Sequence, residues 1–368
     1  MVLSDTDLKL LHLLETSPTI SVRELAHRAG ISWITADRHL RELRENGVIS
    51  DSVAVFGPSR LGLDRLSVLL KAGRESQVRQ LESACDAHPY THYRSRVYGP
   101  YAGLFAQFDI PHEGVAMLKR FLTELQDGGV CERVTYLRSM DYRRSTKTNP
   151  ELFDPTTLSW TYSWDKWERD ITAARTELPQ GSPRRRLHEL GLTRVDLSLL
   201  EELTKNASVS QSVLEKKYGL SQSTVSRKLI FLRENVIESV RAQIDRSRFD
   251  ITSTKLFYSP RVPDDDRAKV YNAFSAPSAP PFPLSIDLLE GGGVILWGRM
   301  PPSYEHGLFY LLWSRLPEIQ VFTMDTVGSH SRMYWFYPDN VDFERNTWKY
   351  DEDWMFKKPL SELQQGMA

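Results

Sequence analysis

The stretch GLSQSTVSRKLIFLREN, residues 219–235, has a near copy in GISWITADRHLRELREN, residues 30–46. The match extends upstream without a gap, so that residues 3–46 align with residues 192–235 at a constant separation of 189 positions. Both copies share leucines at helical spacing, the turn glycine and the closing run LREN. A match of this length indicates that the chain contains an internal duplication.

Each copy predicts three short helices. In the first copy, apolar residues recur at helical spacing over 5–16, a second helix over 21–29 ends at Gly30, and Ser32 is a suitable N-cap for a third helix over 33–46. The second copy places the same three helices at 196–204, 210–218 and 222–235. A helix, a short turn with glycine and a further helix form a helix-turn-helix motif. The β-rich segment after each copy favours a winged form, with a hairpin-like wing beside each head.

The third helix starts with short polar residues, which suits contact with DNA. In helix-turn-helix proteins, the second helix of the motif lies in the major groove with its N-terminal residues against base edges. Gln222 can pair with adenine, and Arg227 and Lys228 lie where phosphate contact is expected. Trp33 suits either a thymine methyl or a partner surface. We therefore expect double-stranded DNA to contact Ser32, Trp33, Thr35, Arg38, His39, Ser221, Gln222, Ser223, Thr224, Ser226, Arg227 and Lys228.

Charge distinguishes the two heads. The whole chain has 47 basic and 48 acidic residues, so any contact with nucleic acid depends on local patches. Residues 1–60 carry 7 basic and 8 acidic residues, whereas residues 184–250 carry 13 and 9. Affinity for duplex rests largely on neutralised phosphates, so we expect the second head to bind more strongly. The run Arg184-Arg185-Arg186 either adds to this charge or is a solvated linker.

Strand and helix patterns alternate after the first head. Over residues 65–140 they read strand, helix, strand, strand, helix, strand, with a Gly-Pro turn between the two central strands. The second copy repeats this pattern more loosely, with a proline-rich loop and three consecutive glycines at its turn.

The second head resembles the DNA-binding domain of the Lrp/AsnC (feast/famine) transcriptional regulators. The resemblance rests on the leucine spacing over 196–214, on GLSQSTVSR at 219–227 and on Leu232, and SRLGL at 59–63 resembles the linker of that family. It implies a ligand-sensing RAM-type domain that dimerises through its sheets, a homo-oligomer and a small-molecule effector. Family members usually carry one copy of this unit, whereas this chain carries two.

The expected fold is α+β, with two winged helix-turn-helix heads alternating with two ferredoxin-like βαββαβ sandwich domains. The expected boundaries are head 1 at 1–60, sensing domain 1 at 61–145, aromatic tail 1 at 146–171, a basic linker at 172–191, head 2 at 192–250, sensing domain 2 at 251–336 and aromatic tail 2 at 337–368. Within the chain, the two sheet domains are expected to pair face to face.

The two aromatic tails share a spacing. The pattern P-x3-D-x5-W-x-Y-x2-D starts at Pro150 and again at Pro338, in polar surroundings without an apolar helical stripe. Aromatic residues held at fixed spacing indicate docking. The tails are expected to pack on a sheet domain, their own or the other, and a partner surface is the alternative.

The alternative to a regulator is an enzyme. Siroheme decarboxylases share this architecture, and Thr91-His92-Tyr93-Arg94 resembles one of their strands. His92, Arg94 and Arg96 would then surround the propionates, whereas the other interpretation of His92 is an exposed or core-edge histidine. No nucleophile triad, phosphate loop or metal motif accompanies them, so we expect no enzyme, no cofactor and no metal site.

Cellular context follows from composition. Cys85 and Cys131 are the two cysteines, far apart and without metal spacing, which fits a reducing compartment. The charged, amphipathic N-terminus is unlike a signal peptide, and no apolar run is long enough to span a bilayer. We expect a cytoplasmic protein.

Overall fold

The computed structural model describes residues 2–179, 186–335 and 338–367. Each head has three helices, which are α1 (Asp5–Thr16), α2 (Val22–Ala29) and α3 (Trp33–Glu45), then α8 (Arg194–Lys205), α9 (Gln211–Tyr218) and α10 (Gln222–Asn235). Local signals explain these bounds. Ser4 and Thr193 form capping boxes at the first helices, and Gly30 and Gly219 end the second helices in the left-handed conformation.

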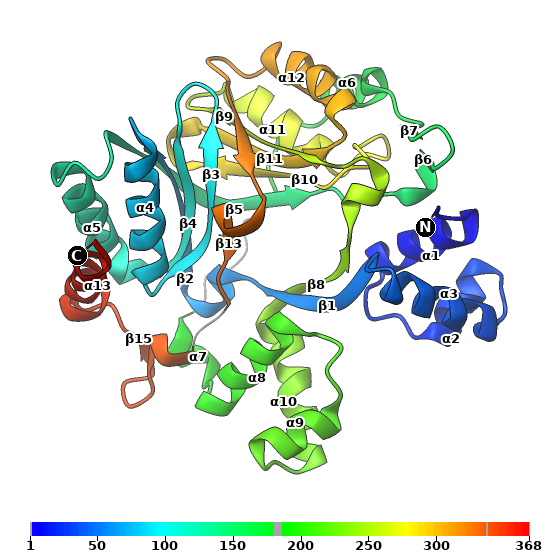
Figure 1. The fold of residues 1–368 in the computed structure, drawn as a ribbon, viewed down its shortest axis with the longest axis horizontal. Coiled ribbons are helices and arrows are strands. Elements are labelled where there is room, and N and C mark those ends of the chain that lie inside the picture. Colours follow the sequence, from blue (N-terminus) through cyan, green and yellow to red (C-terminus); the bar gives the residue numbers. More distant parts are fainter. Residues whose placement is uncertain (1, 180–185, 336–337, 368) are drawn as a thin grey trace.

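The strand that follows each head pairs with its counterpart. β1 (Ile49–Phe56) and β8 (Ile237–Ile244) form an antiparallel ribbon between the two heads. A separate hairpin-like wing was expected beside each head, whereas these strands join one head to the other (Figure 1).

Two βαββαβ units follow the ribbon. Their elements are β2 (Leu63–Lys71), α4 (Glu75–Ala87), β3 (Thr91–Tyr98), β4 (Gly103–Pro111), α5 (Val115–Asp127) and β5 (Arg133–Ser145), then β9 (Ser253–Ser259), α11 (Asp264–Ala273), β10 (Leu284–Leu289), β11 (Val294–Met300), α12 (Glu305–Trp313) and β12 (Gln320–Asp325). The strand order is β12-β9-β11-β10-β5-β2-β4-β3-β13, where β13 is Ser331–Met333. Because β12 also pairs with β3, the sheet closes on itself.

The closed sheet joins the two units by equivalent contacts. In each unit the strands run last, first, third, second, and the β10–β5 and β3–β12 pairs connect one unit to the other. Apolar side chains including Leu69, Phe105 and Phe322 form a buried cluster on one face, and the opposite faces carry the helices. The α+β class expected from the pattern is confirmed.

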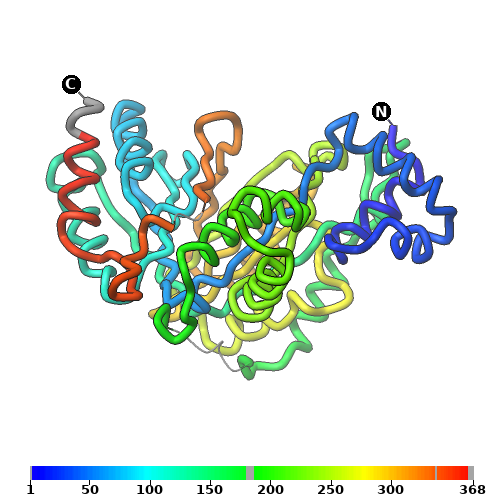
Figure 2. The backbone as a smooth tube through the Cα atoms, turned by 90° about the horizontal axis from the view of Figure 1, so that it is seen from below, coloured from blue at the N-terminus to red at the C-terminus, as the bar shows by residue number. Residues whose placement is uncertain are grey.

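The aromatic tails are exchanged between the halves (Figures 1 and 2). The Trp160 indole donates to the carbonyl of Phe249 at 2.9 Å, and the Trp348 indole donates to the carbonyl of Leu61 at 2.7 Å. Trp167, fully buried, also donates to a second-half carbonyl. Each tail therefore packs on the other half, which decides between the expected alternatives.

The tails also contain regular structure. Their elements are β6 (Phe153–Asp154), β7 (Ser159–Trp160) and α6 (Trp164–Ala173), then β14 (Val341–Asp342), β15 (Thr347–Trp348), a π-helical turn over Asp353–Lys357 and α13 (Lys358–Met367). Helix α6 was missed in the sequence because its buried face consists of two residues one turn apart, Trp167 and Ile171. The absence of a helical stripe expected for this tail was wrong.

Short helical turns connect these elements. They span Pro58–Leu61, His112–Gly114, Pro150–Leu152, Arg246–Phe249, Glu290–Gly292, Pro302–Tyr304, Gly328–His330 and Pro338–Asn340, with α7 at Leu187–Leu190 in the linker. Of the arginine run, Arg184 and Arg185 lie outside the described residues, and Arg186 is exposed. In the described part of the chain, every helix is too short or too polar to cross a membrane.

Candidate nucleic-acid interface

The two heads extend away from the closed sheet (Figures 1 and 2). Polar residues of their third helices are exposed. Val225, Leu229 and Leu232 hold α10 on its head, and Ala36, Leu40 and Leu43 do the same for α3. The predicted contact residues divide by exposure. Exposed are Ser32, Trp33, Arg38, Ser221, Gln222, Ser223 and Arg227, and half-buried are Thr35, His39, Thr224, Ser226 and Lys228.

Both third helices start with the same cap. The Ser32 hydroxyl accepts from the Thr35 amide at 3.1 Å, and the Ser221 hydroxyl accepts from the Thr224 amide at 3.3 Å. The N–H groups of a first helical turn have no partner within the helix, and the helix dipole places positive potential there. Each helix start can therefore receive a phosphate oxygen or a base acceptor.

Two of the predicted DNA-contact residues instead form ion pairs or hydrogen bonds inside the heads. His39 Nδ1 lies 2.8 Å from Asp7 Oδ1, and Lys228 Nζ lies 2.7 Å from Asp196 Oδ1. These pairs are equivalent in the two copies, and each joins the third helix to the capping box of the first. Burial opposes the charge of Asp7, but hydrogen bonds from Ser4 and His39 lower its pKa below the usual range. His39 and Lys228 therefore serve head stability, because each holds the third helix of its head to a carboxylate of the first.

The arginines that precede these two residues in the sequence remain exposed. Arg38 and Arg227 are exposed, and Arg227 Nε donates a long hydrogen bond of 3.4 Å to the Ser223 carbonyl of its own helix. Arg227 also lines a groove of about 360 Å³ between α10 and the short helix α7, beside Thr224 and Phe231. This groove gives head 2 a concave, cationic edge.

Sequence reasoning left out Ile34. Its side chain is 66% exposed beside Trp33, which is 59% exposed, at the first two positions of α3. The equivalent positions of α10 carry Gln222 and Ser223, both exposed. The alignment of the two copies would have found Ile34, because it stands opposite Ser223.

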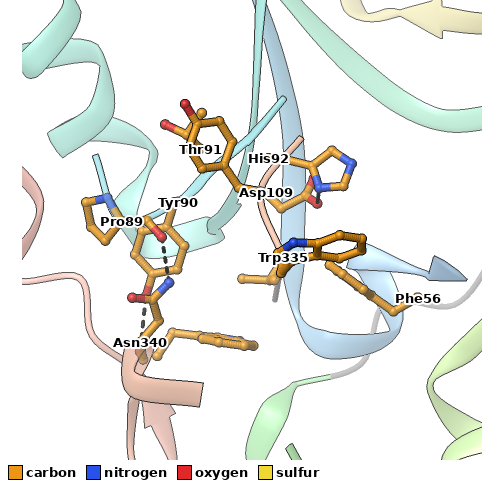
Figure 3. Close-up of a pocket in the computed structure, with 11 residues that line it drawn as sticks. Phe56, Pro89, Tyr90, Thr91, His92, Asp109, Trp335 and Asn340 are labelled. Atoms are coloured by element: carbon orange, nitrogen blue, oxygen red, sulfur yellow. Dashed lines mark hydrogen bonds and ion pairs between the residues drawn. The ribbon is translucent and has the colours of Figure 1, made fainter. Parts of the chain in front are cut away.

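A second candidate site surrounds His92 (Figure 3). Tyr90 immediately precedes β3 and His92 is its second residue, Asp109 lies near the end of β4 and Phe56 ends β1, around a volume of about 30 Å³. A cavity of this size has room for a water molecule. Asp109 accepts two hydrogen bonds from Arg65 at 2.7 and 2.8 Å, and His92 Nδ1 lies 3.3 Å away.

His92 is half-buried and neutral in character, and the two arginines on the same strand are paired with acidic side chains. Burial lowers the pKa of His92 to about 4, although Asp109 acts in the opposite direction. Arg94 pairs with Asp86 at 2.6 Å, and Arg96 Nη2 lies 2.8 Å from Glu82 Oε2. Of the three residues considered for a decarboxylase, His92 lines the pocket, at the edge of the core, whereas Arg94 and Arg96 are committed to carboxylates on or beside α4.

Other reactive groups lie in the core. Cys85 and Cys131 are free and buried, and burial raises the pKa of their thiols to about 12 and about 11. Across residues 2–179, 186–335 and 338–367, no group of three histidine, cysteine or acidic side chains has the arrangement of a metal site.

Known proteins resemble this chain in two ways. A family described as winged helix-turn-helix DNA-binding matches residues 3–50. The HTH-type transcriptional regulator FL11 of Pyrococcus furiosus is 34% identical over 80 residues, which are 21% of this chain and 53% of that protein. The glutamate uptake regulatory protein of Zymomonas mobilis is 33% identical over 76 residues, 20% of this chain and 46% of that protein. The chain thus spans about half the length of the curated relatives it matches.

Solved structures extend the likeness in fold. The siroheme decarboxylase NirDL aligns over 99% of both chains with a TM-score of 0.55 and 13% identity. At that identity the likeness concerns the fold alone. An AsnC family transcriptional regulator from Agrobacterium tumefaciens aligns over 38% of this chain and 90% of its own, at 19% identity and a TM-score of 0.32. The helix-turn-helix sequence of this chain is therefore similar to that of winged helix-turn-helix transcriptional regulators.

Proposed function

We propose that this protein is a sequence-specific transcriptional regulator that binds double-stranded DNA. The observation that carries the proposal is the exposed start of α10, where Gln222, Ser223 and Arg227 face outward above a buried apolar side. A helix of this kind fits the major groove, with its first residues against base edges. The similarity to curated regulators supports the same function.

The proposed architecture is a tandem one, with two winged helix-turn-helix heads and two RAM-type sensing domains in a single chain. The β1–β8 ribbon and the pairs β10–β5 and β3–β12 support it, because they relate the halves as two subunits of a dimer would be related. One chain then supplies both reading heads. The favoured DNA site is correspondingly asymmetric, since the heads differ in sequence.

Association of two chains through the sensing domains is a further part of the proposal, together with a small-molecule effector. Tyr310 and Trp313 on α12 support association, because they are 60% and 61% exposed on the outer side of the second sheet domain. Light scattering of the purified chain tests it. A dimer that Trp313→Ala converts to a monomer is the expected result.

Footprinting of genomic DNA with the purified protein tests the DNA-binding function. We expect protected sites with two unequal halves at low salt, weakened as salt rises. A protein that protects no DNA at low salt contradicts the proposal. The variant Arg227→Ala should weaken every site, because it removes a cation from the helix that faces the groove.

A siroheme decarboxylase is the second candidate, favoured by the full-length likeness to NirDL. The ion pairs near His92 argue against it, since Arg94 and Arg96 are already paired with carboxylates of α4 and are not free to hold propionates. We propose that the chain is not an enzyme. Titration with an iron porphyrin tests this. A Soret shift that His92→Ala abolishes would favour the decarboxylase.

A further inference from the structure

The start of α3 presents an apolar tip where α10 presents a polar one. Trp33 and Ile34 are 59% and 66% exposed at the first two helical positions, and neither belongs to the apolar cluster that supports head 1. Gln222 and Ser223 occupy the same positions in head 2. The caps before these positions are alike, and Arg38 and Arg227 follow alike, so the heads differ chiefly in what their tips can recognise.

The apolar tip is too small for a stable protein interface. Specific protein interfaces bury on the order of 1,200–2,000 Å² in total, which two side chains on a helix end cannot supply. The residues around the tip are polar or charged, among them Ser32, Thr35 and Arg38, as expected for a surface that meets nucleic acid. A thymine methyl is the apolar group that base pairs present in the major groove, and apolar side chains contact it directly.

The net charges of the two heads suit different roles in DNA binding. Residues 1–60 carry one more acidic than basic residue, so phosphate contacts give head 1 little affinity. An apolar contact needs no charge. Head 1 is therefore suited to select a sequence once head 2, with its excess of cations, holds the duplex.

We infer that head 1 reads thymine methyl groups through Trp33 and Ile34, whereas head 2 reads hydrogen-bonding base edges through Gln222 and Ser223. This inference rests on the proposed DNA-binding function and specifies its ligand. The favoured duplex has one half in which thymine methyls are required and one half in which they are not.

The experiment uses the full chain and a duplex selected from a randomised pool at low salt. Thymine is replaced by deoxyuridine, which lacks the methyl, in one half of the site at a time, and affinity is measured by fluorescence anisotropy. We expect binding to weaken about fourfold for each contacted methyl removed from one half, the factor that corresponds to burying one such group. Removal from the other half should leave the affinity unchanged.

Two variants distinguish the effect of the apolar tip on base preference from the effect of losing any exposed aromatic side chain. The double variant Trp33→Gln/Ile34→Ser gives head 1 side chains like those of head 2 and should bind thymine and deoxyuridine duplexes equally. Tyr98→Ala removes an aromatic side chain of similar exposure, 57%, from the first sheet domain and should keep the wild-type preference. Circular dichroism of both variants should match the wild type, because all three side chains are on the surface.

The results distinguish failure of this inference from failure of the proposed DNA-binding function. A wild-type protein that binds both duplexes equally in each half overturns the inference alone, as does a double variant that keeps the thymine preference. Failure to bind any duplex at low salt overturns the DNA-binding function and the inference together. Loss of the preference in the double variant, with binding through head 2 retained, supports both.

Discussion

Replacement of Arg227 by alanine should change how DNA binding depends on salt. The side chain is exposed on the outer side of α10, and within the described part of the chain it forms no ion pair. Its neighbour Lys228 is 2.7 Å from Asp196, whose carboxylate offsets the charge. The two adjacent cations therefore differ in what they can give to a phosphate.

The magnitude follows from counterion release. One neutralised phosphate contributes about −0.9 to the slope of log K against log salt concentration. Arg227→Ala should make the slope shallower by about 0.9. Relative to 1 M salt, this corresponds to roughly an eightfold loss of affinity at 0.1 M.

The assay is a set of anisotropy titrations from about 0.05 to 0.3 M salt, a range over which phosphate contacts strongly affect affinity. The control is Lys228→Met/Asp196→Asn, which removes both members of the ion pair and leaves the local net charge unchanged. We expect this control to keep the wild-type slope. An Arg227→Ala protein with the wild-type slope, or a control with a slope as shallow as that of Arg227→Ala, would refute the assignment of Arg227 to a phosphate.

Three further predictions concern stability. Trp167→Ala should lower the free energy of unfolding by about 3–5 kcal/mol, because it empties a fully buried site. The exposed Tyr98→Ala should change it by less than about 0.5 kcal/mol, and equal costs in urea unfolding would contradict this. Glu15→Gln should lower the free energy of unfolding by about 3 kcal/mol, because Glu15 Oε1 is 2.8 Å from Arg246 Nη2 and the substitution leaves this largely buried cation without its partner. A thermal midpoint equal to that of the wild type would show that the ion pair is dispensable. Burial lowers the pKa of His88 to about 3, so the unfolded chain binds this proton first as the pH falls below about 6.5. The free energy of unfolding should therefore fall by up to about 1.4 kcal/mol per pH unit between about pH 6.5 and about pH 3. His88→Phe should flatten the pH profile of stability by that amount, and an unchanged profile would be inconsistent with a buried neutral histidine.

The heads were predictable because their signals are local. Ser32 and Ser221 cap the third helices as expected, and α3 and α10 end within one residue of the predicted bounds. Helix caps and apolar spacing act over a few residues, so a single sequence contains them. The contact residues at these caps remain predictions, although their exposure is compatible with the proposed role.

The pairing between the halves was not predictable in the same way. A duplicated chain offers each strand and each tail two similar partners, one in its own half and one in the other. The pattern of Trp160 and Trp348 is the same in both arrangements, and only the folded chain shows that each indole reaches a carbonyl of the opposite half. The inward turn of Lys228 was hidden for a related reason, since its partner Asp196 is 32 residues away in the sequence.

The exchanged tails and the shared ribbon explain how the two heads can differ. In a homodimer both heads have one sequence, so a change at a reading position alters both halves of the DNA site together. Here the second head is held beside the first by the β1–β8 ribbon, the closed sheet and the buried indoles, and its presence does not depend on association with another chain. On the proposed roles of these residues, a substitution at Trp33 would change the preference for one half-site, and Gln222 would still read the other. Because the two heads belong to one chain, they need not be identical, and a DNA site for them need not be palindromic. This arrangement permits one head to carry an apolar tip and the other a polar tip.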